Sequence, residues 1–164
     1  MCNPSHVQFG TWYVNQKWSA EMNIKPLHEG FKCPIKGSSA AGGYDIYMPE
    51  GGVLDPVADK GKLVGLGFAA EVPPGHVAKI YPRSSTGAKH GLELNNTVGI
   101  IDADYRGEWM ACLRVKDGHA FSWEAGDRIL QFVIVPVADV NLMVVDELDE
   151  THRGEGGFGS TGEK

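Results

Sequence analysis

The chain has 164 residues, with 42% apolar and 22% charged residues, a formal net charge of −6 and a pI near 5.4. This length and composition indicate one globular domain with a sizeable core, and they exclude a disordered, collagen-like or coiled-coil chain. The negative charge argues against broad binding to nucleic acid, although a few local cations are enough to bind a small polyphosphate.

The sequence predicts a soluble protein of the cytoplasm with no membrane association. Residues 1–6 lack a basic segment followed by an apolar run, and no stretch approaches the ~18 consecutive apolar residues of a membrane span. Cys2, Cys33 and Cys112 are far apart, and no Cys-x-x-Cys pair is present. An odd number of separated cysteines fits a reducing compartment and argues against a zinc site.

Short apolar runs bounded by glycine, proline or a polar turn follow one another along the chain, and they predict strands. The runs are Leu63–Val72, Val77–Tyr81, Thr97–Ile101, Trp109–Val115 and Arg128–Val135. Asp117-Gly118 predicts a hairpin between two of them, and Ser122–Ala125 is expected to form part of one helical turn. Helical periodicity is otherwise scarce, so we expect an all-β sandwich, jelly roll or barrel.

Two terminal segments fall outside this pattern. Residues 1–22 carry Phe9, Trp12, Tyr13 and Trp18 among polar residues, which suits an arm packed on the barrel or a segment that binds a protein partner. Residues 149–164 are rich in glycine and almost without aliphatic side chains, so they cannot order on their own core contacts. We therefore divide the chain into an extension (1–22), a β-barrel (23–148) and a C-terminal arm (149–164).

The arm contains groups that suit a nucleotide. Its glycines let backbone N–H groups approach an anion, and Arg153 can contact phosphate through two N–H groups. Ser160 and Thr161 add hydroxyl donors, and Phe158 offers a ring on which a base can stack. The alternative is a flexible tail without function. A P-loop is excluded because Gly-Lys-Ser/Thr after a strand is missing.

Two internal clusters also carry polar groups. Arg83, Ser84 and Ser85 follow a strand that ends at Pro82, where they open a short anion-binding helix or form a surface turn with a capping serine. Asp102 follows an apolar run and is expected at the strand end, partly desolvated, where a carboxylate can orient and deprotonate water. The alternative for Asp102-Ala103-Asp104 is a turn held by local hydrogen bonds.

Two weaker segments are Gly42-Gly43-Tyr44-Asp45 and Gly126-Asp127-Arg128-Ile129-Leu130-Gln131. Taken alone, Asp45 and Asp127 are interpreted as turn residues, and Gln131 as an outward strand position.

These segments resemble, in order, the five sequence motifs of the trimeric dUTPases (deoxyuridine triphosphatases), and the likeness covers about residues 23–164. Ser85-Thr86 replaces the usual Gly-Leu, and Gly42-Gly43 adds a glycine. The resemblance implies a jelly-roll-like barrel and a homotrimer whose active sites are shared between chains and closed by the arm. Pro136 is placed as the hinge where the C-terminal segment leaves toward a neighbour. The implied reaction is attack of water on the α-phosphorus of dUTP, giving dUMP and pyrophosphate, which keeps uracil out of DNA and supplies dUMP for thymidylate synthesis.

The resemblance also implies individual roles. Asp102 would bind the 3′-OH and act as general base, and Gln131 would touch the attacking water or the α-phosphate. The phosphate-binding residues would be Arg83, Ser84, Ser85, Arg153, Ser160 and Thr161. Uracil and deoxyribose would be bound by Asn96, Gly99, Ile100, Ile101, Tyr105, Met110 and Phe158, with Gly159 in the wrapping backbone. Mg²⁺ would be chelated mainly by the triphosphate, with Asp45 at most contacting its water shell.

Two other functions are compatible with this fold. A dCTP deaminase needs a glutamate in the strand after Asp102, and Trp109–Leu113 contains no acid. A non-catalytic nucleotide-binding regulator would be expected to lack the catalytic acid or the arginine of the arm, and Asp102, Arg153 and Phe158 are all present. The sequence therefore favours hydrolysis of dUTP.

Overall fold

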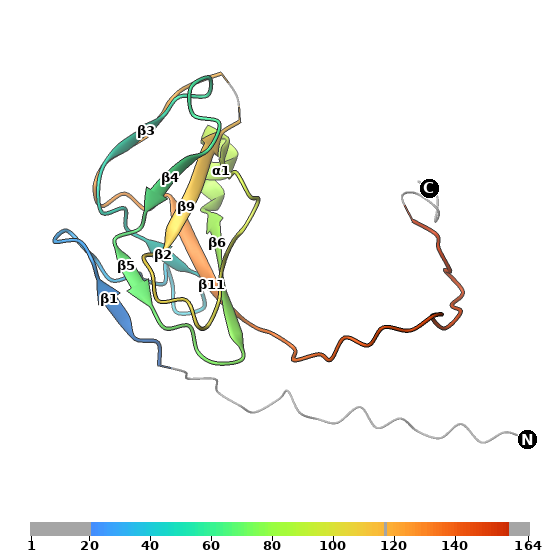
Figure 1. Cartoon of the computed structure of the whole chain (residues 1–164). Helices are drawn as coiled ribbons and strands as arrows, with labels where there is room; N and C mark the ends of the chain where they lie inside the picture. Colours follow the sequence, from blue (N-terminus) through green and yellow to red (C-terminus); the bar gives the residue numbers. More distant parts are fainter. Residues whose placement is uncertain (1–20, 117, 158–164) are drawn as a thin grey trace, which may run out of the picture.

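A computed structural model describes residues 21–116 and 118–157 (Figure 1). The strands are β1 (Ile24–Pro26), β2 (Tyr44–Ile46), β3 (Gly52–Leu54), β4 (Lys62–Gly65), β5 (Phe68–Ala70), β6 (His76–Pro82), β7 (Leu92–Leu94), β8 (Gly99–Ile101), β9 (Met110–Val115), β10 (Phe121–Trp123) and β11 (Leu130–Pro136). One short helix, α1 (Ser84–His90), follows β6. The predicted all-β, jelly-roll-like fold class is confirmed.

The strands form four antiparallel sheets around one core. The largest has the order β2-β11-β6-β8, a second has β4-β9-β7, and β1-β5 and β10-β3 form pairs. Alternate residues of β7, β8, β9 and β10 are buried, and the buried apolar side chains of different sheets meet in a single cluster. Its largest fully buried side chains include Trp109, Phe68 and Phe132, and the Trp109 ring centroid lies 5.1 Å from each of the other two. This core fixes the register of β11 against β2 and β6, which carry the site.

Two local predictions were wrong, and long-range contacts explain both. Leu63–Val72 is not one strand, because Gly67 has a φ of 76° and its N–H donates to Glu108 Oε1 at 2.9 Å, which separates β4 from β5. Ser122–Ala125 is not a helical turn, because Phe121–Trp123 pairs with β3. The predicted hairpin turn includes Asp117, which lies outside the described residues; of the strands on either side, β9 pairs with β4 and β7, and β10 pairs with β3.

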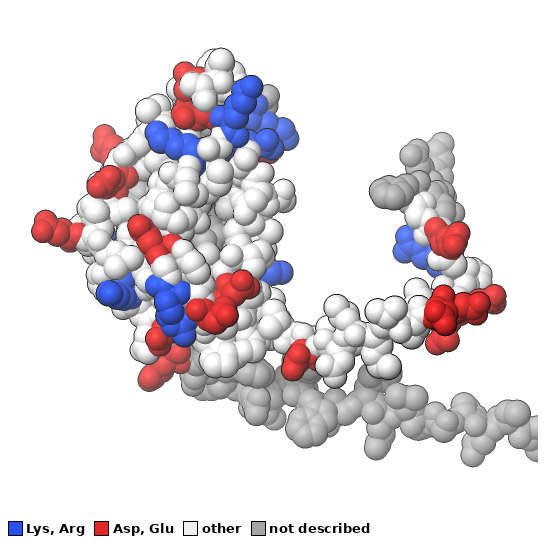
Figure 2. All heavy atoms as spheres, in the orientation of Figure 1, with Lys and Arg blue, Asp and Glu red and all other residues white. Residues whose placement is uncertain are grey.

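The chain leaves the barrel after Pro136 (Figures 1 and 2). Residues 137–157 form no strand or helix, and almost all of them are exposed, including the apolar side chains of Leu142, Met143 and Val144. Within the described residues, no helix is long and apolar enough to cross a membrane. Cys33 and Cys112 are free thiols, and Cys2 lies outside the described residues.

Candidate active site

Asp45 lies in the middle of β2 and is buried, with only 7% of its surface exposed. The interpretation of Asp45 as a turn residue was therefore wrong: it pairs across β2 and β11 with Gln131, so both side chains lie on the same face of the sheet. Asp127, by contrast, is a turn residue as expected, since its carboxylate accepts the N–H of Glu124 at 2.9 Å.

Arg83 connects the end of β6 to the start of α1. It is the N-cap of α1 in extended backbone conformation, which places Ser84 and Ser85 in the first turn, both exposed. The predicted short helix is confirmed, and no serine caps it. The buried Thr86 hydroxyl lies 2.9 Å from the Arg83 carbonyl oxygen and 2.8 Å from that of Ile129, so it ties α1 to the segment before β11.

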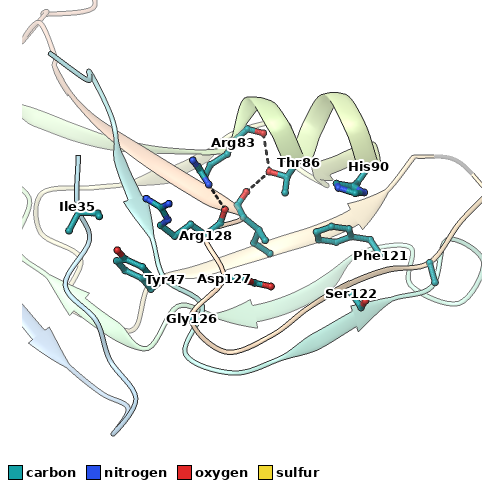
Figure 3. A pocket seen from close by; sticks show the side chains of 12 residues that line it. Ile35, Tyr47, Arg83, Thr86, His90, Phe121, Ser122, Gly126, Asp127 and Arg128 are labelled. Carbon is teal, nitrogen blue, oxygen red and sulfur yellow. Dashed lines mark hydrogen bonds between the residues drawn. The ribbon is translucent and has the colours of Figure 1, made fainter. Parts of the chain in front are cut away.

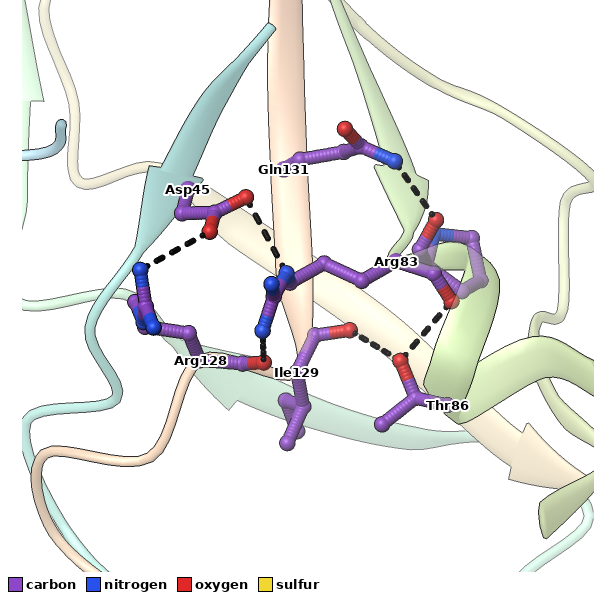
Figure 4. A network of polar contacts seen from close by, with 7 residues as sticks. Asp45, Arg83, Thr86, Arg128, Ile129 and Gln131 are labelled. Atoms are coloured by element: carbon purple, nitrogen blue, oxygen red, sulfur yellow. Dashed lines mark hydrogen bonds and ion pairs between the residues drawn. The ribbon is translucent and has the colours of Figure 1, made fainter. Parts of the chain in front are cut away.

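Two arginines converge on Asp45 (Figure 4). Arg83 Nε lies 3.1 Å from Asp45 Oδ1, and Arg128 Nη1 donates to Asp45 Oδ2 at 3.2 Å. Arg83 Nη1 also donates to the Arg128 carbonyl oxygen at 2.9 Å. A buried carboxylate paired with two guanidinium groups is well compensated, and the trio carries a formal net charge of +1.

Gln131 is half-buried beside this trio. Its Nε2 donates to the Pro82 carbonyl oxygen at 3.2 Å, directly before Arg83 in the chain (Figure 4). The strand face therefore brings together Asp45, Arg83 and Gln131 from three of the predicted segments.

An open cavity of about 920 Å³ adjoins the arginines (Figure 3). Its lining is largely polar and includes Arg83, Thr86, His90, Ser122 and Arg128. The guanidinium group of Arg128 also lies over the ring of Tyr47, at 5.7 Å from its centroid. Guanidinium groups that converge on an open polar cavity favour an anionic ligand.

Asp102 lies elsewhere on the barrel. It follows β8 and is exposed in this chain, contrary to the expected partial desolvation, and it opens a turn closed by a bond from the Tyr105 N–H to the Asp102 carbonyl oxygen at 3.2 Å. Ile101 pairs with Ala78 of β6, five residues before Arg83. The five residues from Ala78 to Arg83 span roughly 17 Å at ~3.3 Å per residue. Asp102, which follows Ile101, therefore lies near the opposite end of β6 from Arg83.

The residues predicted to bind uracil and deoxyribose lie around β8. Asn96 lies in the loop before β8, where its carbonyl oxygen accepts the Val98 N–H at 2.7 Å. Gly99 is buried, and a Cβ there would approach the Ile80 Cβ to 3.1 Å, so a side chain at this crossing of β8 and β6 would press against Ile80. Ile100 is exposed, Ile101 is buried and Met110 begins β9, while the Tyr105 hydroxyl donates to the Glu108 carbonyl oxygen.

The described part of the arm, residues 149–157, is not brought to either cluster. Arg153 is exposed, and its Nε donates to the Gly156 carbonyl oxygen at 2.7 Å. Phe158, Gly159, Ser160 and Thr161 lie outside the described residues, as do residues 1–20 of the N-terminal extension.

Sequence reasoning missed Arg128 and Thr86. Arg128 belongs to the segment Gly126–Gln131, but nothing in the local sequence pattern indicated that it would contact the Asp45 carboxylate, 83 residues earlier. Thr86 stands where the family usually has leucine. Its hydroxyl was the one sequence feature that could have indicated a hydrogen bond at this position.

Comparison with known proteins agrees with this geometry. A model of the dUTPase family matches residues 29–162. A curated deoxyuridine 5′-triphosphate nucleotidohydrolase of Nautilia profundicola is 39% identical over 142 residues, covering 87% of this chain and 99% of that protein. The curated protein of the same name from Debaryomyces hansenii is 42% identical over 153 residues, covering 90% and 93%.

Solved structures show the same fold. A structure of Staphylococcus bacteriophage 80alpha dUTPase with dUPNHPP has a TM-score of 0.77 and 26% identity, covering 88% of this chain and 99% of that one. A mutant dUTPase from phage phi11 of S. aureus, described as showing the coordination of a structural Mg(II) ion, has a TM-score of 0.69 and 23% identity, with coverage of 78% and 98%.

The fold and the site thus define an all-β protein of the jelly-roll type, with two arginines beside an open polar cavity. The chain belongs to the dUTPase family, as the family model and the curated relatives show.

Proposed function

We propose that this protein hydrolyses dUTP to dUMP and pyrophosphate by attack of water on the α-phosphorus. The observation that carries the proposal is the convergence of Asp45, Arg83 and Gln131 on one face of the largest sheet, in a chain that belongs to the dUTPase family. The reaction would keep uracil out of DNA and supply dUMP for thymidylate synthesis.

Arg83, Ser84 and Ser85 bind the middle of the triphosphate in this proposal. The exposure of both serines and the orientation of Arg83 beside an open polar cavity support this role. Guanidinium and hydroxyl donors suit phosphate oxygens because the bonds are charge-assisted. Gln131, next to Arg83, contacts the attacking water or the α-phosphate.

Uracil and the sugar occupy the surface around β8. Asn96 and the backbone of Gly99–Ile101 would read uracil, in a pocket that would be too narrow for the methyl group of thymine. Tyr105 and Met110 line the sugar side and leave no room for a 2′-OH. Asp102 binds the 3′-OH and, as general base, accepts a proton from the attacking water.

A single chain cannot supply all of these groups to one dUTP molecule. The roughly 17 Å between the Asp102 and Arg83 ends of β6 is too far for both to contact reacting atoms around one α-phosphate. We therefore infer a homotrimer in which Asp102 of one chain faces Arg83 of another. This arrangement would also desolvate Asp102, which is exposed in the isolated chain.

Two surface features support such an assembly. Residues 137–148 present apolar side chains without a partner in their own barrel, and those of Val140, Leu142, Met143, Val144 and Leu148 are at least two-thirds exposed. A cavity of about 610 Å³, lined mainly by apolar residues such as Ile24, Phe132 and Ile134, opens on the barrel. Exposed apolar surface of this kind marks protein contacts.

The arm completes the site as a third contribution. Arg153, Ser160 and Thr161 contact the γ-phosphate, Phe158 stacks on uracil, and Gly159 belongs to the backbone that wraps the ligand. The described part of the arm, residues 149–157, is largely exposed in the isolated chain and carries the donors of Arg153, which supports a role in closing over a ligand rather than in stabilising the barrel.

Mg²⁺ is the proposed cofactor, held mainly by the triphosphate oxygens. Within the described residues no three His, Cys, Asp or Glu side chains gather to hold a metal ion, and both oxygens of Asp45 face arginines. A donor set of this kind fits an ion that is carried by its substrate and keeps several waters, with Asp45 at most contacting its water shell. Bound there, the ion would offset part of the triphosphate charge.

A panel of nucleoside triphosphates tests the function. Pyrophosphate release is measured for dUTP, dTTP, dCTP and UTP with Mg²⁺ and with a chelator. We expect turnover of dUTP alone, with a large loss when Mg²⁺ is removed. Ammonia release from dCTP would instead identify a deaminase, and binding without turnover would identify a regulatory nucleotide-binding protein; either result contradicts the proposal.

A further inference from the structure

Arg83 reaches the cavity with part of its donor capacity already used. Its Nε pairs with Asp45 Oδ1 and its Nη1 donates to the Arg128 carbonyl oxygen. Among the residues that the structure describes, Nη2 has no acceptor, so both of its N–H groups are available to a ligand. The side chain is 31% exposed, which leaves this end of the guanidinium group accessible.

The shortest contact between Asp45 and Arg83 joins Oδ1 to Nε, and the second oxygen of Asp45 is engaged by Arg128. Arg128 Nη1 donates to Asp45 Oδ2 at 3.2 Å. Arginine and carboxylate groups otherwise tend to pair through two parallel bonds. Without Arg128, rotation of the Asp45 carboxylate would let it take both Nε and Nη2 of Arg83, and the donors that face the cavity would be lost to an internal ion pair.

Arg128 is itself held in place from two sides. Its guanidinium group lies over the Tyr47 ring, and its backbone follows the turn in which Asp127 accepts the Glu124 N–H. The Arg83 N–H donates to the Ile129 carbonyl oxygen at 3.0 Å, so the segment 128–129 also fixes the backbone of Arg83. The position of the Arg128 side chain is thus tied to the same short segment that places Arg83.

We propose that Arg128 is a positioning residue for polyphosphate binding, which acts by engaging Asp45 so that Nη2 of Arg83 stays free for the ligand. This inference rests on the proposed function, because it takes the triphosphate of dUTP as the ligand of Arg83. It predicts that Arg128 affects the binding of the phosphates and not of the nucleoside, and that its effect depends on Arg83.

A double-mutant cycle tests the proposal. The dissociation constants of dUMP and of a dUTP analogue with an imido bridge between the α- and β-phosphorus are measured by calorimetry, with Mg²⁺ present. The proteins are the unmutated full chain, Arg128→Gln, Arg83→Gln and the double variant. We expect Arg128→Gln to raise the dissociation constant of the analogue by about tenfold or more but that of dUMP by only about twofold. In the Arg83→Gln background, the same change should raise the dissociation constant of the analogue only about twofold.

Two further variants guard against a general loss of structure. Arg114→Gln removes an exposed arginine of β9, which is paired with Glu93 at 2.9 Å and lies in a different sheet from Asp45, and it should leave both dissociation constants unchanged. Arg128→Lys keeps one donor for Asp45, so it should bind the analogue more tightly than Arg128→Gln. If Arg128→Gln does not fold, Arg128→Lys replaces it in the cycle, with an expected loss of about threefold that again depends on Arg83.

Several results would overturn the positioning role. Equal weakening of dUMP and the analogue would indicate a merely structural residue. If the effects of the two substitutions on the affinity for the analogue simply multiply in the double variant, Arg128 contacts phosphate by itself. If Arg128→Gln does not change that affinity, Arg128 has no role in binding. If the unmutated protein neither binds nor hydrolyses dUTP, the proposed function fails instead, which is a separate and recognisable outcome.

Discussion

Gln131 and Asp45 are directly opposite each other in the ladder between β11 and β2. Two segments that lie far apart in the sequence therefore present an amide and a carboxylate on one face, about 4.5–5.5 Å apart at Cβ in such pairs. The Pro82 carbonyl oxygen, bonded to Gln131 Nε2, joins the end of β6 to this face. The ladder, rather than any loop, sets the spacing of the site.

Gly43, just before β2, leaves room for the side chain of Gln131. A Cβ at residue 43 would approach Gln131 Oε1 to 3.0 Å and the Phe132 carbonyl oxygen to 3.2 Å, whereas a Cβ at Gly42 would meet nothing within 4 Å. We expect Gly43→Ala to displace the Gln131 side chain and lower kcat for dUTP about tenfold, with a loss of about 1 kcal/mol in the free energy of unfolding. Steady-state kinetics and urea denaturation measure the two effects.

Gly42→Ala is the matched control for that change, and it should preserve both quantities. Equal activity of the two variants would show that the side chain of Gln131 does not need this position for catalysis.

Asp102→Asn is expected to lower kcat for dUTP by about 10²–10⁴-fold, because an amide cannot accept a proton from water. The amide can still hydrogen-bond the sugar, so binding of dUMP should persist in calorimetry. Asp104→Asn, two residues later in the same turn and also exposed, is the control and should stay active. An Asp102→Asn protein that keeps half of the normal kcat would contradict the assignment of the general base.

In the proposed trimer, the apolar segment 137–148 is expected to contact a neighbouring chain. The Val144 side chain is fully exposed in the single chain, and if a neighbouring chain buries it, Val144→Asp should shift the mass in solution from about three times 17.7 kDa toward the monomer. Val57→Asp places the same charge at another exposed valine, in the turn after β3, and should leave the mass unchanged. Analytical ultracentrifugation at micromolar concentration compares them. A wild-type monomer with full activity would refute the shared site.

Deletion of residues 152–164 should leave the Tm nearly unchanged, because the described part of this segment buries little apolar surface. It should abolish most activity, since Arg153 and the glycine-rich backbone are removed from the site. When the truncated chain is unfolded and refolded together with the inactive Asp102→Asn chain, mixed trimers should regain part of the activity. Full activity of the truncated chain alone would exclude the arm from the mechanism.

The sequence predicted the all-β class and gave the short helix at Ser84 as one of two alternatives, because apolar runs and their boundaries are local signals. It could not predict that Trp123 would pair in a strand with Gly52, because the two residues are 71 positions apart in the sequence (123 − 52 = 71). The same limit applies to Asp45. Its neighbours Gly42-Gly43 indicate a turn, and only the ladder with β11 and the two arginines shows why a carboxylate is tolerated in a buried strand.

The exposed segment after Pro136 also bears on how the activity would be lost. A protease can cut an extended, accessible chain without waiting for the barrel to unfold. A single cleavage within residues 149–157 would release the rest of the arm and leave a barrel that is folded, thermally stable and inactive. The working life of this protein in a cell extract would then be set by the rate of that cleavage, and neither thermal melting nor a circular dichroism spectrum would report it.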